Sequence, residues 1–286
     1  MTQVKRNVAV IGSGTMGSQI AMVTALAGYD VMLQDISKES LEKAEAKLRK
    51  RMERNVEKGR ITQVEVNRAF ERLVFTTELN KVADAELVIE AIVENIDIKR
   101  ELFKQLSDIT ANETILATNS STIVSSKLAD VVTNPSRVCN IHFFNPALVM
   151  EMVEVVKGPH TSDEVAEKAI DFVRSIGKTP VLLRKEISGF IANRILGKVF
   201  DEAVFLYDNG YASHEEIDLI CKKALNHPIG PFELLDLVGI DVSYNARVQR
   251  YKESGDEADK PAKLLREKVE KGELGRKTGK GFYTYN

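Results

Sequence analysis

The chain has 286 residues, of which 43% are apolar and 29% charged, and its formal net charge is −2. This length allows one large domain or two ordinary ones, and the near-neutral charge gives no reason to expect a nucleic-acid partner. No window approaches the ~18 apolar residues of a membrane span. The opening "MTQVKRNVAV" lacks the apolar stretch of a signal peptide, so we expect no membrane association and a cytoplasmic protein. The two cysteines, Cys139 and Cys221, form no CxxC pair, so we expect no metal site and no disulfide framework.

Strand-like and helix-like segments alternate along the first two-thirds of the chain. Short apolar runs predict strands within residues 6–12, 29–35, 85–93, 114–120, 137–144, 150–156 and 179–185. Apolar residues at helical spacing predict a helix over 15–27, and a long charged helix is expected over 38–58. Such alternation predicts an α/β sheet with much parallel pairing.

Beyond about residue 185 the strand pattern ends and helical patterns replace it. The segment "GFIANRILGKVFDEAVFLYDNG" has a helical period and ends at Gly210. Ser213 and Glu216, three residues apart, form a capping-box pattern for a further helix. The segment "NHPIGPFELLDLVGID" breaks at its prolines and resumes as a helix, whereas the tail "GRKTGKGFYTYN" is expected to be a loop.

The segment "NVAVIGSGTMGSQIA" places a GxGxxG pattern between a predicted strand and a predicted helix. Gly12 permits the tight turn, Gly14 lets the backbone approach a pyrophosphate, and Gly17 allows close packing of helix on strand. The helix N-terminus offers N–H groups and a positive dipole end to the phosphates. Asp35 ends the second predicted strand, where a carboxylate binds the adenosine ribose and repels the 2′-phosphate of NADP. The other residues of the turn expected at the cofactor are Ser13, Thr15 and Met16.

The cofactor predicted by this pattern is NAD. From these residues alone, FAD or a purely structural glycine turn are the alternatives. Taken with the element pattern, the motif predicts a Rossmann-type dinucleotide-binding domain over residues 1–186, followed by a mostly α-helical C-terminal domain over residues 187–286.

A histidine and a glutamate lie on two neighbouring predicted strands. His142 is in "VCNIHFFNP" and Glu154 is in "MVEVV", and the Asn-Pro step between them indicates a turn, so the side chains could meet across adjacent strands. Histidine suits the removal of a hydroxyl proton during hydride transfer from an alcohol, and a carboxylate on its other nitrogen would fix the tautomer. A structural histidine is the alternative, and His227 is a rival base. His160 and His214 stand in polar surroundings and are expected at surface or cap positions.

Polar residues gather in two other places. The run "ATNSSTI" puts Asn119, Ser120 and Ser121 just after a predicted strand, where ligands bind in an open α/β sheet. Ser121 or Thr122 could instead cap the next helix. Asn193 lies in an apolar helical segment and needs a partner, which could be the substrate or the backbone.

Seven segments together resemble a known family. They are "GSGTMGSQIA", "EAIVENIDIKRELF", "HFFNP", "MVEVV", "GFIANRIL", "HPIGPFELLDLVGID" and "GRKTGKGFYTY". They are similar to the 3-hydroxyacyl-CoA dehydrogenases, especially the short stand-alone 3-hydroxybutyryl-CoA dehydrogenases, over essentially the whole chain. The resemblance implies NAD-dependent interconversion of an (S)-3-hydroxyacyl-CoA and the 3-ketoacyl-CoA, with a place in fatty-acid or butanoate metabolism.

The resemblance also implies roles for individual residues. His142 matches the catalytic base and Glu154 its orienting carboxylate, while Ser121 and Asn193 match polar residues of the substrate site. The positions that match cofactor contacts, or lie on the nicotinamide side, are Glu94, Lys99, Ser121, Asn145 and Lys277.

The long charged helix is where the family binds coenzyme A. Arg54 and Lys58 are spaced i, i+4 and share one face, so both could reach the anionic end of coenzyme A. A solvated charged face is the alternative.

The apolar helices after residue 186 predict a homodimer.

Three positions depart from the family pattern near the expected site. Leu148 and Glu151 stand in "FFNPALVME" where the family usually has proline and lysine, and Ser188 replaces a common proline. These departures leave the acyl-chain preference open. The physiological direction of the reaction and the choice between fermentation and fatty-acid breakdown are also open. A dehydrogenase of a free hydroxy or sugar acid, or a non-catalytic NAD-binding relative, are the alternative functions.

Overall fold

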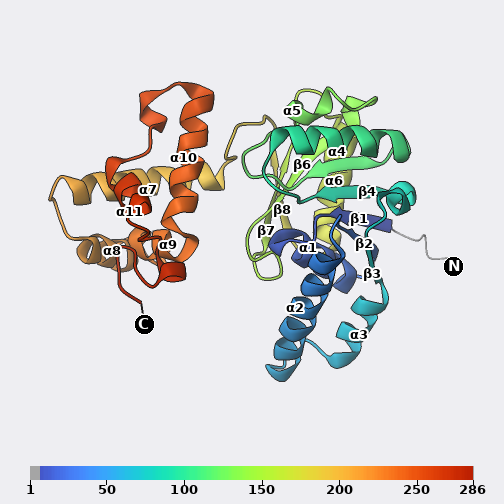
Figure 1. Cartoon of the computed structure of the whole chain (residues 1–286), viewed down its shortest axis with the longest axis horizontal. Coiled ribbons are helices and arrows are strands. Elements are labelled where there is room, and N and C mark those ends of the chain that lie inside the picture. The colour runs from blue at the N-terminus through green and yellow to red at the C-terminus, as the bar shows by residue number, and fades with distance from the viewer. Residues whose placement is uncertain (1–6, 286) are drawn as a thin grey trace. The chain divides into compact units, whose positions relative to one another are not determined.

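The polypeptide divides into two units in the computed structural model, the first ending at Phe190 and the second beginning at Ile191. The boundary predicted from the sequence lies near residue 186. The structure describes residues 7–285 (Figure 1). Residues 1–6, on which part of the signal-peptide expectation rests, and residue 286 lie outside the described part. Within residues 7–285, no helix combines the length and the apolar character needed to cross a membrane.

A sheet of eight strands forms the centre of the first unit, in the order β3-β2-β1-β4-β5-β6-β7-β8 among the described residues. Neighbouring strands run parallel, except that β6 and β7 are antiparallel. The strands are β1 (Asn7–Ile11), β2 (Asp30–Gln34), β3 (Leu73–Thr76), β4 (Leu87–Glu90), β5 (Ile115–Thr118), β6 (Val138–Phe143), β7 (Met152–Val156) and β8 (Thr179–Leu183).

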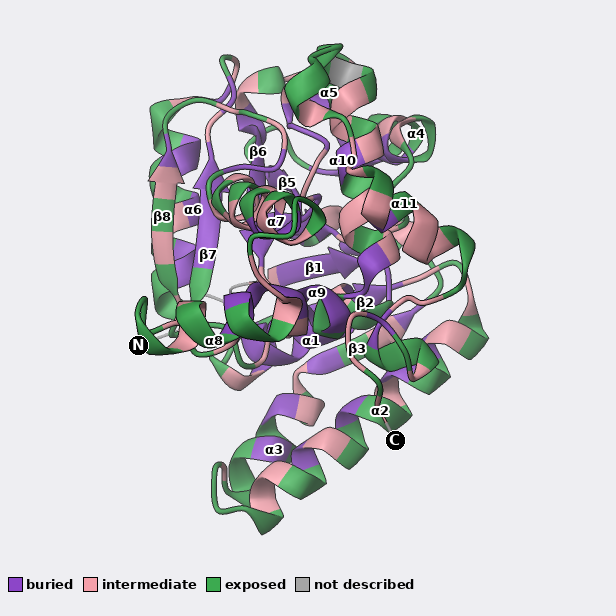
Figure 2. Ribbon diagram, turned by 90° about the vertical axis from the view of Figure 1, so that its left-hand side faces the viewer, coloured by how far each residue is buried: buried purple, intermediate pink, exposed green. Residues whose placement is uncertain are grey.

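Helices connect these strands and cover both faces of the sheet. They are α1 (Thr15–Leu26), α2 (Lys38–Glu57), α3 (Gln63–Glu71), α4 (Ile96–Ile109), α5 (Ser126–Ala129) and α6 (Asp163–Ser175), with the short 3₁₀ turns η1 (Leu79–Asp84) and η2 (Pro135–Arg137). In β1, Val8 and Val10 pack into one core cluster with side chains of α1, α2, α3 and α6, whereas Ala9 and Ile11 pack into another with side chains of α4 and α5. Burial on both faces explains the continuous apolar runs (Figure 2).

The predicted alternation of strands and helices is confirmed, but α3 and β3 are not among the elements predicted from the sequence. The strand β3 has only four residues and lies at the edge of the sheet, where Val74 is 51% exposed. Edge position shortens the apolar run that would otherwise reveal a strand. For α3 a usable signal was present, because Thr62 and Glu65 form a capping box at its start.

The second unit is helical, as predicted. Its helices are α7 (Ala192–Asp208), α8 (His214–Lys223), α9 (Pro231–Val238), α10 (Ile240–Ser254) and α11 (Lys263–Glu270), with η3 (Glu257–Asp259) and η4 (Arg276–Thr278). The capping box of Ser213 and Glu216 at the start of α8 is confirmed. The tail is predicted as a loop, and its described residues contain only the short turn η4 and isolated bridges. This loop is held by Asp236, whose carboxylate accepts from the N–H groups of Phe282 and Tyr283.

Candidate active site

The glycine turn after β1 has the shape expected of a phosphate-binding turn. Gly12 has a positive φ of 99°, and a Cβ there would come within 2.7 Å of the carbonyl oxygen of Ala91. A Cβ on Gly17 would come within 1.8 Å of the carbonyl oxygen of Gly12. Gly14, in contrast, faces open space. The first and third glycines are therefore required by packing, and the second leaves the backbone open to a ligand.

The start of α1 is suited to an anion. Gly14 is its N-cap and supplies no side-chain hydrogen bond, and the first turn of α1 carries no acidic residue. The first N–H groups of the helix thus face the open side of the turn with the positive end of the helix dipole. These features fit the pyrophosphate of a dinucleotide.

Asp35, directly after β2, is tied to the same turn. Its Oδ2 accepts hydrogen bonds from the N–H and the Oγ of Ser13, each at 2.7 Å, and its Oδ1 accepts from the N–H of Ser37 at 3.0 Å. A carboxylate has about four acceptor positions, so three donors do not saturate it. The charge of Asp35 is thereby held at the end of β2 beside the glycine turn, where the ribose of NAD would bind.

The order of the strands places the other polar groups along the same edge. The chain passes from β1 to β2 on one side, and β4 pairs with β1 on the other. Ligands of open α/β sheets bind beyond the carboxyl ends of the strands at such a reversal. The loops that follow β4 and β5 begin at this edge, and they carry Glu94 and Ser121.

His142 and Glu154 are direct partners in the antiparallel register of β6 and β7. Nδ1 of His142 lies 2.8 Å from Oε2 of Glu154, and each residue is only 3% exposed. The expectation that the two side chains meet across adjacent strands is confirmed. A carboxylate at Nδ1 holds a proton there and leaves Nε2 to exchange a proton with a ligand.

Ser121 lies at the other nitrogen of the ring. Its Oγ is 3.1 Å from Nε2 of His142. The rings of Phe144 and Phe190 flank the imidazole, with centroids 4.7 Å and 5.2 Å away. The histidine is therefore oriented by a carboxylate, a hydroxyl and two aromatic rings, as a general acid–base requires.

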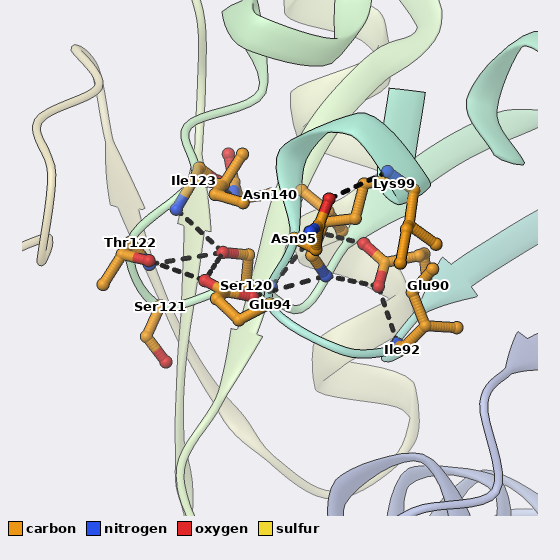
Figure 3. Close-up of polar contacts among 12 residues, drawn as sticks. Glu90, Ile92, Glu94, Asn95, Lys99, Ser120, Ser121, Thr122, Ile123 and Asn140 are labelled. Carbon is orange, nitrogen blue, oxygen red and sulfur yellow. Dashed lines mark hydrogen bonds and ion pairs between the residues drawn. The ribbon is translucent and has the colours of Figure 1, made fainter. Parts of the chain in front are cut away.

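A buried ion-pair network lies between β4, α4 and β5 (Figure 3). Nζ of Lys99 is 2.5 Å from Oε1 of Glu90, and both side chains are at most 1% exposed. The same Nζ is 3.4 Å from Oε2 of Glu94. Burial alone would raise the pKa of Glu94, but Lys99 and the hydroxyls of Ser120 and Thr122 outweigh it and lower that pKa.

Two members of this network, Glu90 and Thr118, were missed by the sequence analysis. Oε2 of Glu90 accepts a hydrogen bond of 2.6 Å from Oγ1 of Thr118. The available signal was an acidic residue inside the apolar run "ELVIEAIV". Buried charges are nearly always paired, so a glutamate in a strand buried on both faces indicates a cationic partner.

The other predicted site residues lie as follows. Asn145 is exposed just after β6, and Arg54 and Lys58 are exposed at the end of α2. In the second unit, Asn193 is half-buried in the first turn of α7, and Nζ of Lys277 lies 2.7 Å from Oδ2 of Asp241.

The remaining histidines differ from His142 in their surroundings. His160 is half-buried, with Nε2 3.1 Å from the carbonyl oxygen of Val138, and burial lowers its pKa. His214 packs its ring against Tyr283, with centroids 4.7 Å apart. The rival base, His227, lies in the second unit, where it lines an apolar groove. Among the described residues, no cluster of His, Cys, Asp or Glu could hold a metal ion.

Models of two protein-family domains match the sequence. The NAD binding domain of 3-hydroxyacyl-CoA dehydrogenase matches residues 7–187, and the C-terminal domain of the same enzyme matches residues 189–285. The probable 3-hydroxybutyryl-CoA dehydrogenase of Deinococcus radiodurans is 41% identical over 96% of this chain and 99% of its own length. The 3-hydroxyadipyl-CoA dehydrogenase of Escherichia coli is 39% identical over 98% of this chain and 59% of its own length.

A solved structure gives the same result. The (S)-3-hydroxybutyryl-CoA dehydrogenase from Ralstonia eutropha has a TM-score of 0.94 and 38% identity, covering 98% of this chain and 99% of that chain. The two family domains, the full-length relatives and the matching architecture agree with the glycine turn and its acid. The chain therefore belongs to the 3-hydroxyacyl-CoA dehydrogenase family, NAD-dependent oxidoreductases that act on a CH–OH group.

Proposed function

We propose that this protein interconverts (S)-3-hydroxybutyryl-CoA and acetoacetyl-CoA, with His142 and Glu154 as the acid–base pair. The observation that carries the proposal is the buried contact of 2.8 Å between Nδ1 of His142 and Oε2 of Glu154, with Nε2 directed at Ser121. Relatives named for 3-hydroxybutyryl-CoA support the substrate, because they match the chain over nearly its whole length.

In the oxidation, His142 accepts the substrate hydroxyl proton at Nε2, and Glu154 stabilises the imidazolium that results. Ser121 binds the reacting oxygen and keeps it within reach of Nε2. Asn193 binds the substrate oxygen or the thioester carbonyl. When bound, NAD would serve as the hydride acceptor. In the reduction, His142 returns the proton to the same oxygen.

Cofactor binding is assigned to the residues of the glycine turn and to Asp35, with further contacts from Glu94, Lys99, Asn145 and Lys277. The open backbone at Gly14 and the charge of Asp35 support this assignment. Asp35 also favours NAD over NADP, because a carboxylate repels the 2′-phosphate.

Coenzyme A is assigned to the exposed end of α2. Arg54 and Lys58 are both exposed, and no ion-pair partner is found for either among residues 7–285. The neighbouring Arg51 is turned to α1, where its Nη1 donates to Oε1 of Gln19 at 3.1 Å. Arg54 and Lys58 are therefore open to a phosphate group at the C-terminal end of α2.

A homodimer through the second unit is part of the proposal. An apolar groove of about 720 Å³ lies along α7 and α8. Ile195, Ile220 and Leu225 on it are each more than half exposed, and an apolar surface of this kind is typical of subunit interfaces. Sedimentation of the double variant Ile195→Lys, Ile220→Lys should give half the mass of the wild type; an unchanged mass would refute the dimer on this face.

We place the enzyme in the cytoplasm.

The first experiment is the loss of NADH absorbance with acetoacetyl-CoA, run beside NADPH and beside free acetoacetate. Turnover with NADH and the thioester alone is expected. Reduction of free acetoacetate would favour a dehydrogenase of free hydroxy acids, and folded protein that binds NADH without turnover would favour a non-catalytic relative.

The hydrogen-bonded order Ser121–His142–Glu154 is also the order found in acyl-transfer enzymes. A thiol assay on acetoacetyl-CoA without NADH separates the two chemistries. We expect no release of free coenzyme A, and steady release would assign Ser121 a nucleophilic role instead.

A further inference from the structure

Glu94 is held at the junction of two loops, one after β4 and one after β5 (Figure 3). Its Oε1 accepts hydrogen bonds from the hydroxyls of Ser120 and Thr122, the latter at 2.6 Å. These two residues flank Ser121. One carboxylate oxygen therefore fixes the chain on both sides of the serine that contacts His142.

The other oxygen of this carboxylate, Oε2, faces Lys99, which lies in the first turn of α4. Nζ of Lys99 lies 3.4 Å from Oε2 of Glu94 and 2.5 Å from Oε1 of Glu90. Glu90 is itself fixed, since Oε1 accepts from the N–H of Ile92 at 2.7 Å and Oε2 accepts from Thr118. The contacts form one continuous path from the end of β4 to Ser121.

Burial decides what Lys99 does. Its side chain is 1% exposed, and that of Glu90 is fully buried. A buried charge that loses its partner is strongly destabilising, so Lys99 is held between the two carboxylates. Glu94 is the more accessible member, with 44% of its side chain exposed. The network thus has a rigid base, Glu90 and Lys99, and one arm that reaches the loop of Ser121.

We propose that Glu94 is a positioning residue for Ser121, and that Lys99 and Glu90 fix the place of the Glu94 carboxylate. The kinetic part of the test rests on the function proposed above. Glu94 holds Ser120 and Thr122, these hold Ser121, and Ser121 stands at Nε2 of His142. This role is separate from the cofactor contact proposed above for Glu94 and Lys99, because it acts through the histidine on kcat rather than on NADH affinity.

The kinetic test is a double-mutant cycle in the full-length protein. Glu94→Gln should lower kcat for acetoacetyl-CoA by about 10-fold when kcat is measured at saturating NADH, so that any loss of the proposed cofactor contact appears in the Kd for NADH and not in kcat. In a Ser121→Ala background, the same substitution should change kcat by less than about 2-fold, because the residue through which it acts is gone. Effects that multiply in the double variant, or a loss confined to NADH affinity, would overturn the proposal.

Matched variants separate positioning from general disturbance. Thr122→Ser keeps the hydroxyl that Glu94 holds and should stay close to wild type, whereas Thr122→Val removes it at nearly equal size and should reproduce part of the Glu94→Gln loss. Asp97→Asn removes a neighbouring exposed carboxylate and should leave kcat unchanged. Equal losses in Thr122→Ser and Thr122→Val would refute a role for the hydroxyl.

A second readout needs no turnover. At a fixed pH, the NMR signals of the His142 ring, assigned with His142→Gln, should move in Glu94→Gln and in Ser121→Ala and should not move in Asp97→Asn. His142 ring signals in Glu94→Gln identical to those of the wild type would overturn the positioning role. If the wild type does not reduce acetoacetyl-CoA, the proposed function fails while these spectra still decide the role of Glu94.

Discussion

Buried carboxylates occur in both units, but their partners differ. In the first unit, Glu154 contacts His142 and Glu90 contacts Lys99, so each faces a basic side chain. In the second unit, Asp218 accepts from the N–H groups of Phe232 and Glu233 and from a tyrosine hydroxyl. Asp236 does the same for the tail.

This difference distinguishes buried carboxylates that take part in catalysis from those that stabilise the fold. A carboxylate that accepts only from backbone N–H groups and phenols holds a loop in place and does not orient a basic side chain. A carboxylate on a histidine or lysine controls the charge and direction of that partner. The glycines agree with this division, because a Cβ on Gly230 or Gly281 would lie within 2.5 Å of Asp218 or Asp236. Part of the family-like segments "HPIGPF" and "GKGFYTY" is therefore required by packing around an acid.

The largest expected effect is on the His142–Glu154 pair. His142→Gln should lower kcat by roughly 10²–10⁴, because it removes the general acid–base at Nε2. Steady-state reduction of acetoacetyl-CoA measures the effect, and unchanged NADH binding shows that the fold is intact. Near-normal turnover would show that His142 has only a structural role, and the distinction between the buried carboxylates of the two units would then fail.

The corresponding change in the second unit should act on stability. Asp218→Asn turns an acceptor of three hydrogen bonds into a group with one acceptor oxygen, which should lower the free energy of unfolding by about 2–4 kcal/mol. Urea unfolding measures it, with the exposed Asp208→Asn as control. Wild-type stability in Asp218→Asn would mean that these contacts are replaceable.

The stability difference between the wild type and Asp218→Asn should also depend on pH. Burial outweighs the hydrogen bonds and raises the pKa of Asp218 above its ordinary 3.8. A raised pKa in the folded state means that the folded protein holds the proton more tightly than the unfolded chain. The stability advantage of the wild type over Asp218→Asn should be largest below the ordinary carboxyl range and decline as pH rises through the raised pKa. An advantage that grows over this range would contradict the assignment.

A smaller effect is expected at the cofactor turn. Asp35→Ser removes the charge that repels a 2′-phosphate, so the ratio of NADPH to NADH efficiency should rise by about 10-fold. Ser13→Ala, which removes one donor from the same carboxylate, is expected to change this ratio less. A ratio unaffected by Asp35→Ser would assign cofactor choice to other residues.

The smallest effect is expected at the exposed cations. Arg54→Ala with Lys58→Ala should raise the KM for acetoacetyl-CoA by a few-fold without changing kcat, because exposed ionic contacts are each worth about 0–1 kcal/mol. The increase should shrink at high salt, since exposed charges are screened. A KM equal to that of the wild type at low salt would assign the end of α2 to solvent, and Lys47→Ala provides the control on the same helix.

Much of the first unit was predictable because its signals are local. Continuous apolar runs, three glycines and an acid at a strand end reveal the sheet, the turn and the cofactor, since each pattern reflects backbone geometry within a few residues. The pairing of His142 with Glu154 was also accessible, because a turn between two strands brings them into register. The family resemblance added roles that spacing does not reveal.

Tertiary structure alone decided the partners of the buried charges. The sequence contains Glu90, Lys99 and Thr118, yet nothing local indicates that they meet, because their contacts depend on how β4, α4 and β5 pack together. The same holds for Asp236, which pins a tail that looks like a loop. Backbone patterns are set by neighbours along the chain, whereas a buried charge is satisfied by whichever groups packing brings to it.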